Sequence, residues 1–442
     1  MQLVLPKQVK KIIEVLEGHG YEAFAVGGCV RDSLLGRTPD DWDITTSAKP
    51  QVVKELFPRT VDTGLQHGTV TVLMDRVGYE VTTYRLDGEY EDGRHPREVT
   101  FTDNLIEDLK RRDFTINAMA YSASAGLVDA FDGAGDLKQG VIRCVGDASC
   151  RFEEDALRIL RAVRFSAQLG FVIEQETRKA IRNLAGNLKR ISAERIQTEL
   201  VKLLNSPHPD YLRQAWELGI TSVILPEFDA AMETPQNNPH HRYSVGEHTL
   251  AALGEVPEEK ALRLTMLFHD LGKPLVRTTD RDGIDHFYGH ARVGAELAKQ
   301  ILKRLKFDNA TIKKTVKLVE YHGIRPKPRE ESVRKLASKL GRELYPQLLQ
   351  VQRADACAKA PDTKREQLER LAQICRIYQG ILERKECLTL KELAVCGADL
   401  IGDGMKPGPE IGQVLAQLLE HVLEVPEHNT REYLLEYSKA LR

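Results

Sequence analysis

The feature that most constrains the fold is a change of pattern near residue 148. Before it, short apolar runs rich in valine, threonine and tyrosine alternate with helix-like stretches and glycine turns, which is typical of a domain that combines helices with a sheet. After it, apolar residues recur at helical spacing, as in DALRILRAVRFSAQL and REQLERLAQICRIYQGILERK. The sequence therefore predicts an α+β fold class, in which a head that contains a sheet is followed by an all-α remainder.

Length, charge and cysteine content limit the number of domains, the kind of partner and the cellular location. A chain of 442 residues exceeds what one hydrophobic core usually supports and implies two to four domains. With a formal net charge of −2, a polyanionic partner would be bound by local basic stripes rather than by a globally basic protein. The seven cysteines form no Cys-x-x-Cys pair, which favours a reducing, cytoplasmic location. No apolar run is long enough to cross a bilayer, so no membrane partner is expected.

Two aspartates follow a glycine turn near the N-terminus. The apolar run at 23–26 ends in a glycine pair before a predicted helix, so Gly28 and Arg31 are candidates to hold a phosphate. Asp41 and Asp43 are two residues apart, so on a strand both carboxylates project from one face. Adjacent carboxylates favour a cation between them, and Mg²⁺ binds carboxylate and phosphate oxygens, which predicts a two-metal site for phosphoryl or nucleotidyl transfer. Taken alone, both features also fit ordinary surface turns.

A third carboxylate is predicted beside this pair. Residues 79–85 have the pattern of a strand, which would bring Glu80 next to Asp41 and Asp43. The alternative is a surface glutamate on an exposed strand face, and the sequence leaves the two open.

The string that contains these residues resembles a known family. VGGCVRDSLLGRTPDDWDITT is similar to the nucleotidyltransferase signature of the DNA polymerase β superfamily, in its class II branch of tRNA CCA-adding enzymes and bacterial poly(A) polymerases. RRDFTINAMA and DAFDGAGDLKQGVIRCVGD resemble the second and third motifs of that family, in the same order. The resemblance implies a polymerase-β-like head with a mixed sheet, in which Asp41, Asp43 and Glu80 are catalytic and Asp41 and Asp43 bind Mg²⁺. It further implies four regions: head 1–148, helical neck 149–205, helical body with a metal-binding module 206–360, and helical tail for tRNA binding 361–442.

The second motif supplies predicted nucleotide-binding residues. Arg111 and Arg112 offer guanidinium forks for triphosphate oxygens, while Asp113 and Asn117 suit ribose hydroxyls or loop fixing. The alternative is a capped helix with arginines on its solvated first turn.

A fourth match lies at the start of the neck. Asp155 and Arg158 are three residues apart on a predicted helix, which also carries Arg161, and would therefore share a face. Cytosine and adenine both present an amino donor next to a ring-nitrogen acceptor, which an aspartate and an arginine can meet together. A wrong base would leave buried polar groups unpaired at a cost of roughly 1 to 3 kcal/mol each, so this pair can replace a template. Salt bridges from Glu154 or Asp155 to Arg158 are the alternative.

Two segments bear on the choice within the family. The stretch 56–73 resembles the CCA-adding form and lacks the basic string of bacterial poly(A) polymerases. The segment 84–101 resembles the flexible loop of CCA-adding and A-adding enzymes, with Asp92, Arg94 and Arg97 as polar groups that would reshape the pocket, although an ordinary mobile loop rich in charge and glycine would look similar.

A second constellation lies in the all-α part. His248, the pair His269-Asp270, His290, His322 and Asp355 occur in an order that resembles the HD-domain phosphohydrolases. With His248, His269, Asp270 and Asp355, nitrogen and oxygen donors combine into a set suited to a divalent transition metal, and His290 and His322 are available for a second ion or a phosphate. The resemblance implies phosphatase or 2′,3′-cyclic phosphodiesterase activity on RNA ends, or else a structural insert.

These features together predict an enzyme that adds C, C and A to the 3′ end of tRNA from CTP and ATP. An A-adding enzyme or a poly(A) polymerase is the alternative within the class. A phosphohydrolase with an inactive head, or a non-catalytic RNA-binding protein, is the alternative from other classes. No oligomeric state is predicted.

Overall fold

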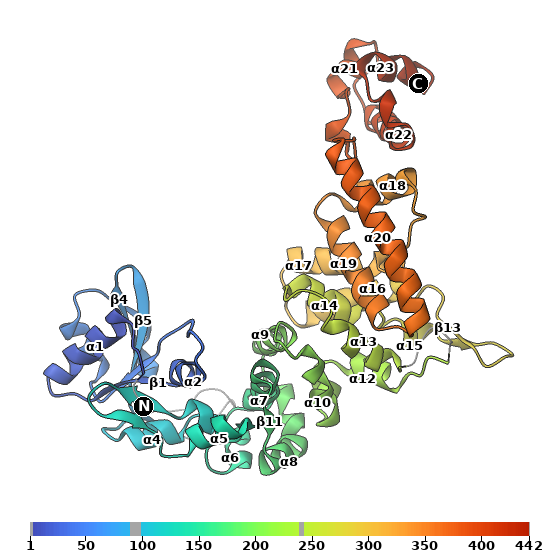
Figure 1. Ribbon diagram of the computed structural model, residues 1–442. Coiled ribbons are helices and arrows are strands. Elements are labelled where there is room, and N and C mark those ends of the chain that lie inside the picture. The colour runs from blue at the N-terminus through green and yellow to red at the C-terminus, as the bar shows by residue number, and fades with distance from the viewer. Residues whose placement is uncertain (1–2, 89–98, 238–242, 442) are drawn as a thin grey trace. The chain divides into compact units, whose positions relative to one another are not determined.

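The computed structural model describes residues 3–88, 99–237 and 243–441 (Figure 1). The chain forms two compact units, Met1–Pro226 and Glu227–Arg442, and each is described by itself. The predicted loop residues Asp92, Arg94 and Arg97 lie outside the described residues. Within the described part of the chain, no helix is both long and apolar enough to cross a membrane.

A seven-stranded mixed sheet forms the head of the first unit. Its strand order is β3-β4-β5-β2-β1-β8-β9. Only β2 and β5 run parallel to each other, and the remaining neighbours are antiparallel. The strands are β1 (Ala23–Val26), β2 (Ile44–Thr46), β3 (Thr60–Gly64), β4 (Thr69–Met74), β5 (Val77–Thr83), β8 (Ala120–Ser122) and β9 (Gly126–Val128). The predicted mixed sheet is thereby confirmed.

Short helices cover this sheet. The first of them, α1, buries Val9, Ile12, Ile13 and Leu16, which recur at helical spacing and pack toward β1. The head helices are α1 (Lys7–Gly18), α2 (Gly28–Leu34), α3 (Pro50–Leu56), α4 (Leu105–Lys110) and α5 (Gly133–Gln139). A separate ribbon, β6 (Arg85–Asp87) with β7 (Val99–Phe101), flanks the segment 89–98 that lies outside the description.

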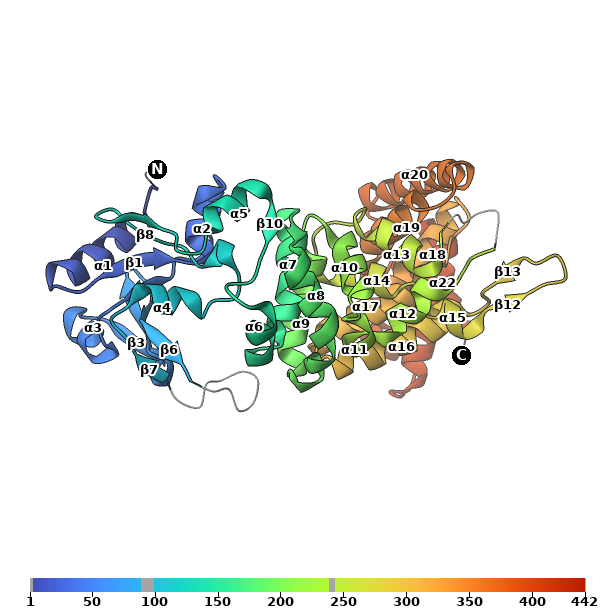
Figure 2. The same ribbon diagram turned by 90° about the horizontal axis from the view of Figure 1, so that it is seen from below.

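The neck is a group of helices that packs onto the head. The helices α7 and α9 lie side by side, as do α6 and α8 (Figure 2). Gly170, with φ 73°, ends α7 in the left-handed conformation that glycine adopts without strain. The helices are α6 (Ala148–Glu154), α7 (Leu157–Leu169), α8 (Gln175–Leu184), α9 (Ala193–Leu204), α10 (Leu212–Glu217) and α11 (Thr221–Ile224), accompanied by the two-residue parallel pair β10 (Val141–Ile142) and β11 (Val172–Ile173).

The second unit is helical apart from one small hairpin among its described residues. The hairpin pairs β12 (Thr278–Thr279) with β13 (Asp285–His286). The body helices are α12 (Pro226–Glu233), α13 (Val245–Leu253), α14 (Lys260–Phe268), α15 (Lys273–Val276), α16 (His290–Arg304), α17 (Asn309–Tyr321), α18 (Glu330–Leu340), α19 (Leu344–Cys357) and α20 (Pro361–Glu383). The tail helices α21 (Gly397–Gly402), α22 (Glu410–Glu424) and α23 (Arg431–Lys439) enclose a core of their own around Leu400, Leu418 and Leu434. The predicted division into four regions stays a prediction beside this two-unit arrangement.

Candidate active site

A glycine turn joins β1 to α2 and carries the first predicted residues. Gly27 has φ 81°, a conformation that side chains disfavour, and a Cβ atom there would lie 2.9 Å from Nη1 of Arg112. The turn therefore needs glycine both for its backbone angle and for the close approach of an arginine from a distant segment. Gly28 and Arg31, which follow, line the cleft described below.

Three carboxylates gather where β2 begins. Asp41 and Asp43 lie in the segment that leads into β2 rather than on the strand itself, and the Asp43 carbonyl accepts a hydrogen bond from Val26 N at 3.0 Å. The parallel register pairs Ile44 with Val81, so Glu80 comes next to Asp43. The structure thus brings together the three residues that the sequence predicted.

Electrostatics in this group favour a bound cation. Enclosure by the cleft raises the pKa of Asp43, an effect that Arg112 opposes and Asp41 reinforces. Desolvation, then Asp43, then Asp41 raise the pKa of Glu80. Like charges that raise each other's pKa are relieved by a divalent cation, and carboxylate oxygens are the donors that Mg²⁺ prefers. The donor set therefore fits Mg²⁺.

Asp41 and Asp43 line a cleft of about 580 Å³ between head and neck segments of the first unit, whereas Glu80, on the neighbouring strand β5, is not among its lining residues. The head wall includes Gly28, Arg31, Asp41 and Asp43. The neck wall is lined by Arg164, Gln168, Leu169, Lys202, Asn205, Ser206 and Pro207. The head wall is mainly acidic, whereas the charged groups of the neck wall are basic.

Four predicted nucleotide-binding residues form one hydrogen-bonded chain. Arg31 donates to Asn117 Oδ1 at 2.7 Å, and Asn117 Nδ2 donates to Asp113 Oδ1 at 3.1 Å. Arg161 of α7 then donates from Nε and Nη2 to Asp113 Oδ2, at 2.8 and 2.6 Å. Burial opposes ionisation of Asp113, but Arg161 and the Asn117 hydrogen bond together hold the pKa of this carboxyl well below its usual range. The chain links the glycine turn of the head to the neck.

Arg111 and Arg112 are held by an aspartate that the sequence analysis missed. Asp108 is fully buried; Arg111 Nε donates to its Oδ1 at 2.9 Å, and Arg112 lies 3.8 Å from its Oδ2. Both arginines follow the C-terminal end of α4, so the alternative of a solvated first turn is wrong. The sequence does contain a signal for Asp108. It lies three residues after Leu105, on the apolar face of α4, where a charged side chain needs a partner.

The predicted placement of Asp155 and Arg158 on one helix face is wrong. The helix breaks between them, because α6 ends at Glu154 and Asp155 has φ −143° and ψ 101°. The Asp155 carboxylate accepts from Leu157 N and pairs with Arg195 of α9 at 2.7 Å. Arg158 instead pairs with Glu154 at 2.6 Å, one of the salt bridges given as the alternative. Neither Asp155 nor Arg158 is among the residues that line the cleft.

The histidines and aspartates of the second unit converge on Asp270. Nε2 of His269, His290 and His322 lie 3.2, 3.5 and 3.6 Å from its carboxylate oxygens. His248 Nε2 lies 3.0 Å from Asp355 Oδ1 and 3.8 Å from Asp270 Oδ2. All six predicted residues therefore belong to one cluster, and two of its three-residue groups have ligand atoms close enough to share an ion.

The tautomers of three histidines point lone pairs into this cluster. In each ring Nδ1 lies 2.7 Å from a backbone carbonyl three residues earlier, that of Met266, Phe287 or Val319. A carbonyl only accepts, so Nδ1 of each ring carries a hydrogen, and in the neutral ring the lone pair is then on Nε2, as in metal-bound histidines. Within the described residues, the buried Nε2 of His269 has no hydrogen-bond partner. These donors fit a divalent transition metal.

Three cations, also missed from the sequence, lie against the two aspartates. Lys273 is 2.7 Å from Asp270 Oδ2, while Lys359 at 2.9 Å and Arg325 both pair with Asp355 Oδ2. They compensate the buried carboxylates in the described structure, so a metal would compete with them. The same cations suit the phosphate of a substrate.

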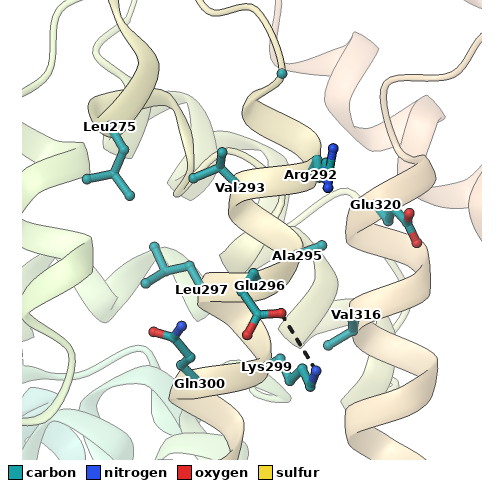
Figure 3. Close-up of a pocket in the computed structure, with 11 residues that line it drawn as sticks. Leu275, Arg292, Val293, Ala295, Glu296, Leu297, Lys299, Gln300, Val316 and Glu320 are labelled. Carbon is teal, nitrogen blue, oxygen red and sulfur yellow. Dashed lines mark ion pairs between the residues drawn. The ribbon is translucent and has the colours of Figure 1, made fainter.

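A larger hollow of about 790 Å³ lies over α16 and α17, and none of the clustered histidines and aspartates lines it (Figure 3). Leu275, Val293, Leu297 and Val316 provide its apolar lining. In this hollow Glu296 pairs with Lys299 at 3.7 Å, as the dashed line in Figure 3 marks, and both side chains are well exposed. Volume alone therefore does not locate the chemistry of this protein.

Three family models match the chain. One described as "Poly A polymerase head domain" covers residues 23–143, one described as "Probable RNA and SrmB- binding site of polymerase A" covers 170–232, and one described as "tRNA nucleotidyltransferase domain 2 putative" covers 283–438. The first contains the glycine turn, the three carboxylates and the chain from Arg31 to Asp113.

Similar proteins extend over nearly the whole chain. The CCA-adding enzyme of Lactiplantibacillus plantarum is 36% identical over 437 residues, covering 97% of this chain and 95% of that protein. The CCA-adding enzyme of Lactobacillus delbrueckii is 37% identical over 436 residues, covering 97% and 96%. The crystal structure of the Bacillus stearothermophilus CCA-adding enzyme in complex with CTP matches with a TM-score of 0.75 and 30% identity, covering 99% of each chain. With its glycine turn, carboxylate group and neck helices in the order predicted, the chain belongs to the family of CCA-adding enzymes.

Proposed function

We propose that this protein adds C, C and A to the 3′ end of tRNA, with CTP and ATP as substrates. The single observation that carries the proposal is the pair Asp41 and Asp43 in a cleft, with Glu80 close enough to interact with both, in a chain that matches CCA-adding enzymes along 97% of its length. Relatives solved with CTP and with tRNA support the choice of substrates.

The carboxylates supply the reaction centre. In this proposal Asp41 and Asp43 hold two Mg²⁺ ions, with Glu80 as a third carboxylate beside them. Mg²⁺ bound there would lower the pKa of the RNA 3′-hydroxyl and neutralise charge on the triphosphate. The 3′-oxygen gives its proton to solvent water and bonds to the α-phosphorus, the bond from that phosphorus to the bridging oxygen breaks, and pyrophosphate leaves.

The arginines orient the triphosphate. Asp108 fixes the guanidinium groups of Arg111 and Arg112, so these forks are ordered before substrate binds. Gly28 and Arg31 line the cleft that contains Asp41 and Asp43 and complete the proposed phosphate contacts. Asp113, Asn117 and Arg161 position Arg31 through the hydrogen-bonded chain.

We further propose that Asp155 and Arg158 read the base. Each would exchange its present partner, Arg195 or Glu154, for the base edge that cytosine and adenine share. In such an exchange the base edge takes over the hydrogen bonds that Asp155 and Arg158 now make with Arg195 and Glu154. The body and tail helices would hold the tRNA.

One experiment separates this function from its alternatives. Purified protein receives tRNA transcripts that end before CCA, after C or after CC, with CTP and ATP supplied singly and together. Complete CCA on the shortest transcript is the expected result. Extension only of the CC end identifies an A-adding enzyme, and long adenosine tails on unrelated RNA identify a poly(A) polymerase. The double variant Asp41→Ala/Asp43→Ala should add nothing, and retained addition would refute the assigned centre.

The cluster around Asp270 supports a second candidate function. We propose that His248, His269, Asp270 and Asp355 bind a divalent transition metal, with His290 and His322 available for a second ion. The converging Nε2 atoms favour this reading over surface or core histidines. Hydrolysis of phosphate from RNA ends, including 2′,3′-cyclic phosphates, is the activity proposed for it. Phosphate release from such ends should require His269 and survive Asp41→Ala/Asp43→Ala; release that persists in His269→Gln would exclude the cluster.

A further inference from the structure

The neck wall of the cleft carries polar groups that the proposed chemistry leaves unused. Lys202 is on the last turn of α9, and Asn205 and Ser206 follow directly after it. All three line the cleft that contains Asp41 and Asp43. Ser206 is 1% exposed, and within the described residues neither its Oγ nor Oδ1 of Asn205 has a hydrogen-bond partner.

Unpartnered groups of this kind suggest a ligand. A buried polar atom without a partner costs about 1 to 3 kcal/mol, so native proteins rarely keep one without a reason. The amide oxygen of Asn205 accepts a hydrogen, whereas the hydroxyl of Ser206 both donates and accepts. Together they match a partner that offers one hydroxyl and one further oxygen.

The charges of the cleft indicate a polyanion on the same wall. Arg164 is paired with Glu199 at 2.8 Å, and Arg31 with Asp32 at 2.9 Å. Among the lining cations, Arg37 and Lys202 have no ion pair with any residue in the described ranges. An unpaired ammonium opposite an acidic wall is placed to attract phosphate without competing for the proposed Mg²⁺ site.

We propose that Lys202, Asn205 and Ser206 bind the 3′-terminal nucleotide of the RNA primer. The ammonium of Lys202 holds its phosphate, Oδ1 of Asn205 accepts the hydrogen of its ribose 2′-hydroxyl, and Oγ of Ser206 donates to an oxygen of the same nucleotide. The assignment rests on the proposed function, since it presents the 3′-hydroxyl to the carboxylates and leaves Arg111 and Arg112 to the triphosphate. Reading the 2′-hydroxyl also distinguishes RNA from DNA.

Equilibrium binding of RNA tests the proposed primer site without any nucleotide addition. The probe is an acceptor-stem hairpin RNA ending in CC, compared with the same hairpin carrying 2′-deoxycytidine as its last nucleotide. Wild-type protein should bind the ribose end about tenfold more tightly, and Asn205→Ala should reduce that preference to nearly one, as expected for one lost hydrogen bond. Lys202→Met should weaken both hairpins about equally and flatten the salt dependence. The control Lys189→Met removes an exposed lysine that does not line the cleft and should change neither.

Stability separates a ligand role from a structural one. Ser206→Ala deletes a hydroxyl without a partner, so the unfolding midpoint should stay or rise while RNA binding weakens; a structural serine would lower the midpoint. Asn205 has φ −87°, which alanine adopts without strain, so Asn205→Ala should fold normally.

Addition kinetics complete the test. The KM for the RNA should rise in the Asn205, Ser206 and Lys202 variants, with the KM for CTP unchanged. A higher KM for CTP instead, or a ribose preference untouched by Asn205→Ala, would overturn the assignment. Wild-type protein that binds hairpins selectively but adds no nucleotide would refute the proposed function alone, because the binding comparison decides the primer site independently.

Discussion

Arg161 donates from both Nε and Nη2 to one oxygen of Asp113, at 2.8 and 2.6 Å. Asp113 belongs to the head, where Asn117 links it to Arg31, and Arg161 belongs to neck helix α7, so this ion pair joins the head to the helix that borders the cleft. Three guanidinium groups, of Arg31, Arg161 and Arg164, also lie over the ring of Phe165. The active-site cleft therefore depends on a mostly buried charge network as much as on apolar packing.

Breaking this pair should destabilise the first unit strongly. Arg161→Met leaves the Asp113 carboxylate, 8% exposed, without its main counter-charge, which typically costs about 3 to 5 kcal/mol. Chemical denaturation followed by a probe in the first unit measures the loss. The control Arg178→Met breaks a half-exposed pair with Glu217 and should cost no more than about 1 kcal/mol. Equal losses in the two variants would contradict the network.

The same pair predicts acid sensitivity. The pKa of Asp113 is lower in the folded protein than in the unfolded chain, because Arg161 and Asn117 outweigh the effect of burial. A depressed carboxyl pKa contributes stability that is present above the unfolded value of about 3.9 and is lost as the pH falls below it. Asp113→Asn should therefore flatten the fall in unfolding free energy below about pH 4. If the unfolding free energy of Asp113→Asn fell as steeply below pH 4 as that of the wild type, this contribution would be refuted.

Protons should compete with Mg²⁺ at the carboxylate group. Desolvation and neighbouring charges raise the pKa of Asp43 and of Glu80, so lower pH protonates these ligands before ordinary carboxyls. The Mg²⁺ concentration for half-maximal nucleotide addition should rise as pH falls from about 8 to 5.5. Glu80→Gln should reduce this pH dependence and lower addition about 10- to 100-fold. A Glu80→Gln enzyme of normal activity would make Glu80 the ordinary surface residue that the sequence left open.

Asp108 should act on nucleotide binding through the arginines it holds. Asp108→Asn weakens the fixation of Arg111 and Arg112, so the KM for CTP and ATP should rise, by up to about 100-fold if their forks shift by 1 Å. Steady-state kinetics at saturating RNA measure the KM for each nucleotide. Glu107→Gln, which breaks the exposed pair of Glu107 with Lys110, is the matched control and should leave the KM unchanged. A raised KM for RNA alone would contradict the assignment.

Metal binding at the Asp270 cluster should be visible as stability. In an Asp41→Asn/Asp43→Asn background, Mn²⁺ at a hundred times its Kd should stabilise the second unit by about 2.7 kcal/mol. His269→Gln should abolish this gain, whereas His286→Gln, a half-exposed hairpin histidine, should not. A gain retained in His269→Gln would show that the metal binds elsewhere.

The order of motifs was readable from the sequence, and so were the α+β head, the helical remainder and most candidate residues. Local spacing determines these features, because periodicity and glycine placement act over a few residues. The tertiary structure alone decided which partners the charged groups take. Glu80 reaches Asp43 through the parallel register of β2 and β5, and Asp108 reaches Arg111 through the end of α4.

The break between α6 and α7 at Asp155 was not predictable from the periodicity of apolar residues. A continuous helical pattern placed Asp155 and Arg158 on one face. Instead, Asp155 adopts an extended conformation, accepts a hydrogen bond from Leu157 N and pairs with Arg195, 40 residues away. Likewise, six histidines and aspartates were foreseen from their order, while Lys273, Arg325 and Lys359 were not. Hydrogen bonds and ion pairs between distant segments depend on the packed geometry, which a one-dimensional pattern of apolar and polar residues does not encode.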